Sequence, residues 1–126
     1  DKLPQEPSRL AETLERLKPQ VGRIILLTMP PDRPDLASRE SIRAGARPPF
    51  FEKPDKRAFR QRFNELAKEQ AAEKVHILDT EPFFVRADGS IRAFDSDGRA
   101  LYYDQKHLSH LGVSEVKGAV RALFLK

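Results

Sequence analysis

Residues 23–29 read Arg23-Ile24-Ile25-Leu26-Leu27-Thr28-Met29, and Pro30-Pro31 follow directly. The centre of this stretch is a continuous apolar run in which apolar and polar positions do not alternate. Such a run is typical of a strand covered on both faces, as the strands of parallel sheets are. The stretch therefore predicts a central parallel strand in an α/β domain.

A connecting helix and a second strand follow this strand in the sequence. The spacing of apolar residues predicts a helix from Pro54-Asp55 to about Lys74. Its apolar face holds Phe59, Phe63, Leu66, Ala67 and Ala71. Residues 75–79, Val75-His76-Ile77-Leu78-Asp79, are then expected to form a short strand. Strand, crossover helix and strand make a right-handed βαβ unit, which favours an α/β fold over an α+β fold.

Two more amphipathic helices are expected near the ends of the chain. Leu10, Leu14 and Leu17 share one helical face, and Pro19 is expected to end that helix. The pattern of the last helix rests on Val113, Val116, Val120, Leu123 and Phe124. Together with the βαβ unit, these segments predict three helices and two parallel strands.

Two regions are expected to lack long regular elements. Residues 30–53 contain five prolines and are long for a connection. They leave the carboxyl end of the first strand, where open α/β sheets place their ligands, so they either border a cleft or form a variable insertion. Further along, Asp88-Gly89 and Asp97-Gly98 are dipeptides typical of hairpin turns.

The composition fits a single domain. The chain has 126 residues, of which 39% are hydrophobic, enough for one domain with a core. It has no cysteine, which excludes disulfides, thiolate nucleophiles and thiolate metal sites. No apolar run is long enough to cross a bilayer, and no charged-then-apolar leader opens the chain, so a soluble piece is expected.

The formal net charge of +4 comes from the stretch between Arg33 and Arg62. This stretch holds nine of the 23 Lys and Arg residues but only four of the 19 Asp and Glu residues. In one interpretation, Arg57, Arg60 and Arg62 form the solvated face of a helix. In the other, the stretch binds an anionic partner. The phenylalanines of the same helix are four residues apart and are expected in the core rather than as a stacking platform, so nucleic acid is not the expected partner.

The residues best suited to chemistry lie in residues 101–112, Leu101-Tyr102-Tyr103-Asp104-Gln105-Lys106-His107-Leu108-Ser109-His110-Leu111-Gly112. In this Asp-x-x-His pair, Asp104 would accept the Nδ1 proton of His107, leaving Nε2 free to take a proton as a general base. The pair could instead make a structural hydrogen bond that caps the last helix. Ser109 suits a helix N-cap better than a nucleophile. A weaker interpretation adds His110 to the pair as a third metal ligand.

The run Leu-Tyr-Tyr-Asp-x-x-His-Leu-Ser-x-x-Gly, entering a terminal helix, resembles the last block of SGNH (GDSL-like) hydrolases. More narrowly, it is similar to the SGNH domain fused behind acyltransferase-3 membrane proteins, which O-acetylate cell-surface polysaccharides. The resemblance implies a three-layer, flavodoxin-like α/β fold, and it implies that Asp104 and His107 complete a Ser-His-Asp triad. Many relatives carry a Cys pair in the hairpin before this block, whereas this chain has none.

The nucleophile of that family lies in a Gly-Asp-Ser motif near the start of the domain, and its oxyanion Gly and Asn lie in two further blocks. None of these motifs occurs here, and no serine of this chain sits in a Gly-Asp-Ser or Gly-x-Ser-x-Gly setting. Residues 1–126 are therefore expected to be the C-terminal portion of a single SGNH-like domain, without its nucleophile.

The resemblance also implies a function for the parent protein. It would be an SGNH-type O-acyltransferase or esterase that transfers or removes acetyl groups on cell-surface polysaccharide hydroxyls, with no cofactor and no metal. Its partners would be an acyl donor, a carbohydrate acceptor, a membrane acyltransferase domain in the same chain and the N-terminal half of the SGNH domain. The expected place is the periplasmic or extracellular face, tethered to the inner membrane. The alternative is a non-catalytic SGNH-like or basic module that binds glycan or an anionic polymer.

Overall fold

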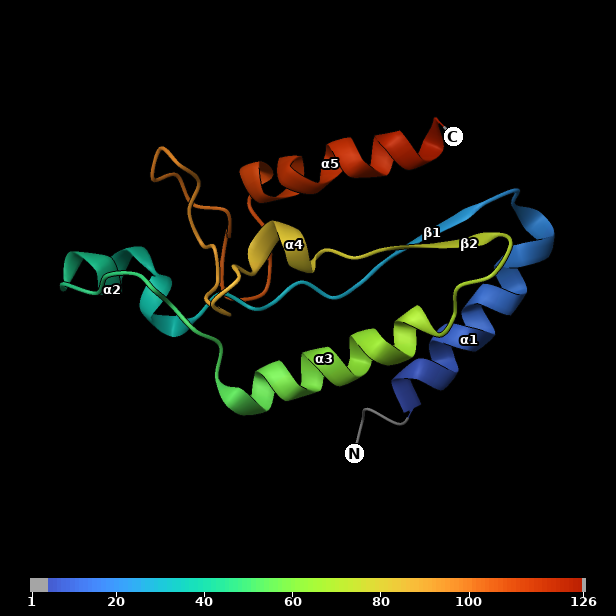
Figure 1. Cartoon of the computed structure of the whole chain (residues 1–126), viewed down its shortest axis with the longest axis horizontal. Helices are drawn as coiled ribbons and strands as arrows, with labels where there is room; N and C mark the ends of the chain where they lie inside the picture. The colour runs from blue at the N-terminus through green and yellow to red at the C-terminus, as the bar shows by residue number, and fades with distance from the viewer. Residues whose placement is uncertain (1–4, 126) are drawn as a thin grey trace.

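Two parallel strands, β1 (Ile24–Leu27) and β2 (Val75–Leu78), lie at the centre of the fold (Figure 1). The computed structural model describes residues 5–125. The two strands pair in register over their whole length. The helix α3 (Pro54–Lys68) connects them, so the predicted βαβ unit and the α/β class are confirmed.

Helices cover the strand pair on both sides and give three layers. α5 (His110–Phe124) lies on one side, and α3 with α1 (Gln5–Leu17) lies on the other (Figure 1). Arg23, just before β1, donates a hydrogen bond to the backbone carbonyl of Leu123 near the end of α5. After α1, a single 3-10 turn, η1 (Lys18–Gln20), contains Pro19, so the predicted end of the first helix is confirmed.

The helix α3 is shorter than predicted, and its buried face differs in part, although Ala67 is buried as predicted. It ends at Lys68 rather than near Lys74, so Ala71 lies outside it. Phe59, which was expected in the core, has 41% of its surface exposed. The face that α3 buries instead carries two polar residues, described next.

Arg60 and Asn64 of α3 are buried, so the prediction that Arg60 lies on a solvated face is wrong. Asn64 is held by the backbone just after β1: its Oδ1 accepts from the Met29 amide at 2.8 Å, and its Nδ2 donates to the Met29 carbonyl at 2.9 Å. Arg60 is bound by two glutamates. Both polar side chains are fully partnered, which is the condition for burying them without a large penalty.

The strand β1 was expected to be central, but in the described residues it pairs with β2 alone. Residues 24–26 are half-buried and Leu27 is exposed, because no third strand covers the other edge of β1 in this part of the chain. An apolar groove of about 600 Å³ runs between the end of β1 and α5, with Leu27, Val113 and Phe124 in its walls.

The segment from residue 30 to residue 53 is more regular than its prolines predict. It contains a 3-10 turn, η2 (Asp35–Ala37), and a short helix, α2 (Arg39–Arg43). Ser38 starts α2 as its N-cap, since the Ser38 hydroxyl accepts a hydrogen bond from the Ser41 amide at 3.1 Å. A short helix, α4 (Glu81–Phe84), likewise follows β2.

The turn-rich region after α4 contributes most of the residues of a hydrophobic core cluster. The expected hairpin turns are present as tight loops, closed by the single bridges Val85 to Ile91 and Phe94 to Ala100. The glycines of the two predicted dipeptides have φ angles of +85° and +79°, which residues with a side chain rarely adopt. The core here consists of Ala37, Phe50, Ile91, Ala93, Leu101 and Tyr102. It supports the loop that carries Asp104 and His107.

Among residues 5–125, no helix combines the length and the apolar character that crossing a membrane requires.

Candidate functional site

The loop between Tyr102 and Leu108 holds the predicted acid-base pair at its tip. An isolated antiparallel bridge between Tyr102 and Leu108 closes the loop. Inside it, the Tyr103 amide donates to the His107 carbonyl at 2.8 Å. The loop is therefore a small, internally bonded unit that leads directly into α5.

Asp104 and His107 are brought together as the sequence predicts. Nδ1 of His107 lies 2.9 Å from Oδ1 and 3.0 Å from Oδ2 of Asp104. The His107 side chain is 75% exposed and that of Asp104 is 49% exposed. With Nδ1 engaged by the carboxylate, Nε2 is the ring nitrogen left to exchange a proton with a reacting group.

The backbone of the same loop fixes the Asp104 carboxylate. Its Oδ1 also accepts hydrogen bonds from the amides of Lys106 at 2.9 Å and His107 at 2.8 Å. The Lys106 amide and then the His107 ring lower the pKa of Asp104 below its ordinary value of 3.8, because both stabilise the charged form. Asp104 is therefore ionised over the whole pH range in which a neutral histidine can act as a base.

We expect a pH titration of the carboxyl carbon of Asp104, followed by NMR, to show a midpoint below 3.8. Because the folded pKa is lowered, the contact is at full strength above the ordinary pKa and is lost as the pH falls through the lowered pKa. In the Lys106→Pro variant, which removes one amide donor, the midpoint should move upward. A wild-type midpoint at or above 3.8 would contradict this assignment.

Ser109 caps α5, as the sequence predicts. Its hydroxyl accepts a hydrogen bond from the Gly112 amide at 3.2 Å and donates one to the Ala100 carbonyl at 2.7 Å. Because the hydroxyl both accepts and donates a hydrogen bond, Ser109 caps the start of α5 and links it to the turn-rich region. In the described residues, the ring of His107 makes its hydrogen bonds to Asp104 and to no serine.

Gly112 has a packing role that the sequence did not reveal. A Cβ atom added there would lie 2.1 Å from the carbonyl oxygen of Leu101. The glycine lets α5 start directly against the strand-like segment before the Asp104 loop. The sequence hint for this close approach was that a glycine ends the block of residues 101–112.

We expect Gly112→Ala to lower the free energy of unfolding by about 1–3 kcal/mol, because the backbone must shift to admit the methyl group. Gly118→Ala is the matched control on the same helix, since nothing lies within 4 Å of a Cβ added there. That change should be neutral or raise the free energy of unfolding by up to about 1 kcal/mol through helix propensity. Urea titrations of the domain measure both values, and equal effects of the two substitutions would contradict the close-packing role.

Hydrogen bonds connect the loop with Asp104 and His107 to the segment that follows β1. The Tyr102 hydroxyl donates to the Pro31 carbonyl at 2.6 Å, and the Arg33 amide donates to the Gln105 carbonyl at 2.9 Å. The side chain of Gln105 also contacts Asp35. Burial raises the pKa of Tyr102 further above its ordinary value, so its hydroxyl stays protonated as this donor. The pair therefore sits at the carboxyl edge of the strands, beside residues 30–53.

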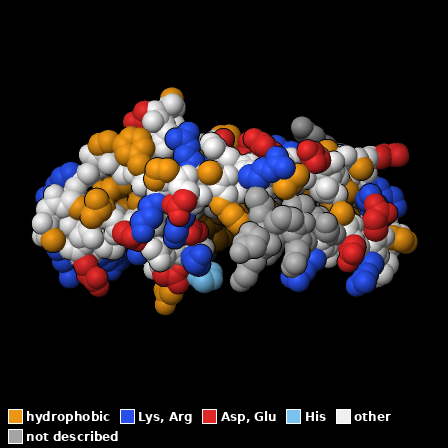
Figure 2. All heavy atoms as spheres, turned by 90° about the horizontal axis from the view of Figure 1, so that it is seen from below, with side chains coloured by type: hydrophobic (Ala, Val, Ile, Leu, Met, Phe, Trp, Pro, Cys, Tyr) orange, Lys and Arg blue, Asp and Glu red, His pale blue; other side chains and the backbone are white. Residues whose placement is uncertain are grey.

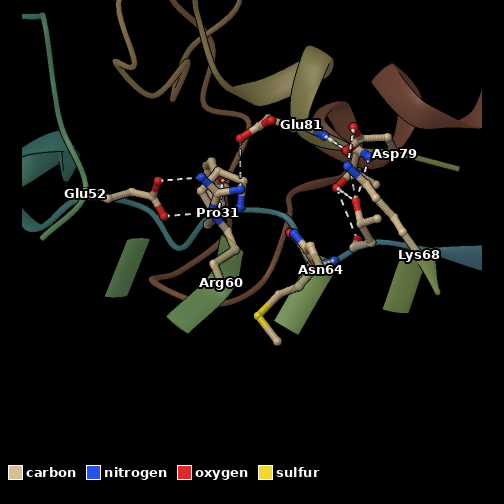
Figure 3. Close-up of polar contacts among 11 residues, drawn as sticks. Pro31, Glu52, Arg60, Asn64, Lys68, Asp79 and Glu81 are labelled. Carbon is tan, nitrogen blue, oxygen red and sulfur yellow. Dashed lines mark hydrogen bonds and ion pairs between the residues drawn. The ribbon is translucent and has the colours of Figure 1, made fainter. Parts of the chain in front are cut away.

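Hydrogen bonds between Thr28 and Thr80 join the two strands just after their carboxyl ends. The Thr80 amide donates to the Thr28 hydroxyl at 2.9 Å, and the Thr80 hydroxyl donates to the Thr28 carbonyl at 3.1 Å. Asp79 accepts from the Glu81 amide at 3.0 Å and from Lys68 at 3.2 Å (Figure 3). Through its bond with the Glu81 amide, Asp79 caps the turn between β2 and α4. Burial opposes the charge of Asp79, but the Glu81 amide and Lys68 outweigh it and lower its pKa.

A buried ion cluster holds residues 50–53 against the rest of the domain (Figure 3). Arg60 Nε and Nη2 donate to the two carboxylate oxygens of Glu52 at 2.9 and 2.8 Å, and Nη1 donates to Glu81 at 3.2 Å. Burial by itself disfavours the charged guanidinium, but the hydrogen bonds and charges of Glu52 and then Glu81 leave the pKa of Arg60 raised. The cluster joins α3, α4 and the segment before α3.

The metal interpretation gains nothing from the structure. Among the described residues, no group of three or more His, Cys, Asp and Glu side chains comes together as a metal site. His110, its third candidate ligand, lines a cavity at the base of the loop, and within the described residues no hydrogen bond or ion pair joins it to Asp104 or His107.

Comparisons with known proteins add to this geometry. A family model described as "SGNH domain (fused to AT3 domains)" matches residues 1–122. The chain is 40% identical over 68 residues to the platelet-activating factor acetylhydrolase IB subunit alpha1 of Pongo abelii, which covers 52% of this chain and 27% of that protein. It is 38% identical over 68 residues to the same subunit of Bos taurus, with the same coverage. The match thus spans about a quarter of the length of these curated relatives.

Proposed function

This chain belongs to the family of SGNH domains fused to AT3 domains, and we propose that the protein containing it is an SGNH-type O-acyltransferase or esterase. The resemblance drawn from the sequence block is confirmed by the family match. The curated relatives are named as acetylhydrolases, which supports chemistry on an acyl ester.

The observation that carries the proposal is the contact between Asp104 and His107 at the carboxyl edge of the strands. In the proposed reaction, a serine hydroxyl attacks the acyl carbonyl while Nε2 of His107 takes its proton. The alcohol of the donor ester then leaves with that proton. The acyl group on the serine passes to a sugar hydroxyl or to water, whose proton His107 accepts and then returns to the serine oxygen as it leaves. Asp104 holds the imidazole in the tautomer that both steps need.

The serine and the oxyanion donors are proposed to come from the N-terminal half of the same SGNH domain. The groove between β1 and α5 supports this, since it is apolar and β1 has an unpaired edge in the described residues. Burying that groove and pairing that edge would supply hydrophobic stabilisation and backbone hydrogen bonds. Residues 1–126 are then the C-terminal portion of the domain.

The substrate and the location are part of the proposal as well. The family description supports a parent chain with an AT3 domain, which would tether this domain to the inner membrane. We propose that the domain works at the periplasmic or extracellular face. Its acceptor would be a cell-surface polysaccharide that gains or loses acetyl groups there.

The test compares turnover of 4-nitrophenyl acetate by the full-length protein and by the 126-residue chain alone. We expect the full-length protein to release 4-nitrophenol, and we expect the chain alone to match buffer, because a base without a nucleophile forms no acyl-enzyme. Adding a separately made N-terminal half to the chain should restore turnover. A domain that only binds glycan would give buffer rates in all three samples and would overturn the proposal.

A further inference from the structure

The largest cavity near Asp104 and His107, of about 910 Å³, lies at the base of their loop. It is lined by Tyr103, at the start of the loop, and by Ser109 and His110, just after the loop. Arg39 and Arg43 of α2 contribute to its walls. The cavity therefore lies between the loop with the pair and the basic segment that the sequence singles out.

The charge of this cavity is strongly one-sided. Its walls carry four arginines and one glutamate, namely Arg33, Arg39, Arg43, Arg99 and Glu40. Arg99 is paired with Asp95 and Asp97. Within the described residues, the other three arginines make no ion pair with a carboxylate. Figure 2 shows Lys and Arg side chains around the end of the molecule that holds α2 in Figure 1, with an acidic patch among them at its lower edge.

Arg33 adds a second, independent observation. Its Nε atom is buried and has no hydrogen-bond partner among the described residues. A buried donor without an acceptor is unfavourable, and an acceptor on a bound ligand would offset that cost. The amide of Arg33 is bonded to the Gln105 carbonyl, so Arg33 is held next to the loop of the pair, where it lines both the 910 Å³ cavity and the neighbouring cavity of about 430 Å³.

The charges of the other two cavities around the loop are more nearly balanced. In the cavity of about 430 Å³, Lys53 is paired with Asp35 and Lys56 with Asp32. In the cavity of about 400 Å³ on the far side of Asp32, Lys106 is paired with the same carboxylate. The 430 Å³ cavity, which Arg33 also lines, has four cationic residues and three carboxylates, and the 400 Å³ cavity has three of each. The 910 Å³ cavity, with four arginines and one glutamate, has an excess of three cations.

We propose that the 910 Å³ cavity binds an acidic group of the acceptor glycan, a carboxylate or a phosphate carried on a sugar ring. The planar guanidinium groups of Arg39 and Arg43 match such oxygens in pairs. Tyr103, 81% exposed, offers a flat apolar face to the ring beside them. The inference rests on the proposed function, because it places the acidic group beside the sugar hydroxyl that is to react at His107.

The test is a calorimetric titration of the full-length protein with three probes: trigalacturonate, glucose 6-phosphate and the neutral maltotriose. We expect at least one acidic probe to bind at least about tenfold more tightly than maltotriose. The affinity for that probe should fall when NaCl is raised from about 50 to 200 mM. Tighter binding of trigalacturonate assigns the site to carboxylates, and tighter binding of glucose 6-phosphate assigns it to phosphates.

The variant R39Q/R43Q should lower the affinity for the favoured acidic probe by roughly 10- to 100-fold, because two charge-assisted contacts are lost. Both arginines are exposed, so the fold should tolerate this change. The matched control R16Q/R62Q removes the same charge from exposed residues of α1 and α3. Equal losses in the two double variants, equal affinity for maltotriose, or tighter binding of a single-stranded deoxyoligonucleotide would each overturn the proposal. The titration needs no turnover, so its failure is distinct from failure of the proposed acyl chemistry.

Discussion

Replacing His107 by alanine should lower kcat/KM of the full-length protein for an acetyl ester by roughly 10⁴- to 10⁶-fold. His107 is placed to take the nucleophile's proton, and its Nδ1 contact of 2.9 Å with Asp104 fixes the ring for that task. The side chain is 75% exposed, so its removal should leave the fold intact. Hydrolysis of 4-nitrophenyl acetate measures the effect.

Asp104→Asn should lower kcat/KM by less, roughly 10³- to 10⁴-fold, because the ring stays present but its preferred tautomer is lost. Lys106→Ala is the control within the same loop. It keeps the backbone amide that binds Asp104 and removes only a side chain whose ion pair with Asp32 is exposed. Its kcat/KM should stay within about threefold of the wild type. If His107→Ala behaved like Lys106→Ala, the acid-base assignment would be wrong.

The second large effect concerns stability. Arg60→Ala should lower the free energy of unfolding by about 3–5 kcal/mol. The side chains of Arg60 and Glu52 are both 4% exposed, so removing the guanidinium leaves a buried carboxylate without its partner. Glu81, at 40% exposure, keeps access to water and contributes less to the loss. Thermal or urea unfolding of the domain measures the change.

Two further variants separate this mechanism from a general loss of positive charge. Arg62→Ala, on the same helix, removes an exposed arginine with a 3.9 Å ion pair and should change the free energy of unfolding by less than about 0.5 kcal/mol. The double variant Arg60→Met with Glu52→Gln should recover part of the stability, because no uncompensated charge remains buried. A double variant as unstable as Arg60→Ala would contradict the account of the cluster.

The elements that could be predicted are those whose signal is local. The short runs rich in apolar residues at 24–27 and 75–78 predicted the two strands, and the helix between them predicted their parallel pairing. Ser109 was predictable as an N-cap because its side chain bonds an amide three residues away. The contact of Asp104 with His107 also spans three residues within one loop.

What could not be predicted depends on partners that are distant in the sequence. Arg60 is buried because Glu52 and Glu81 converge on it from two other segments, and no helical pattern contains that information. Once Arg60 and its polar neighbour Asn64 occupy the inner face of α3, Phe59 is left partly outside. In the same way, the position of the loop with the pair follows from the bond of Tyr102 to Pro31, which are 71 residues apart.

The most direct test of the central claim is to locate the nucleophile chemically. The full-length protein is treated with a fluorophosphonate, which forms a covalent bond to an activated serine, and the modified residue is identified by peptide mass spectrometry. The account predicts a label on a serine outside residues 1–126 and the loss of that label in His107→Ala. A label on a serine within this chain, or a label that persists without His107, would contradict it.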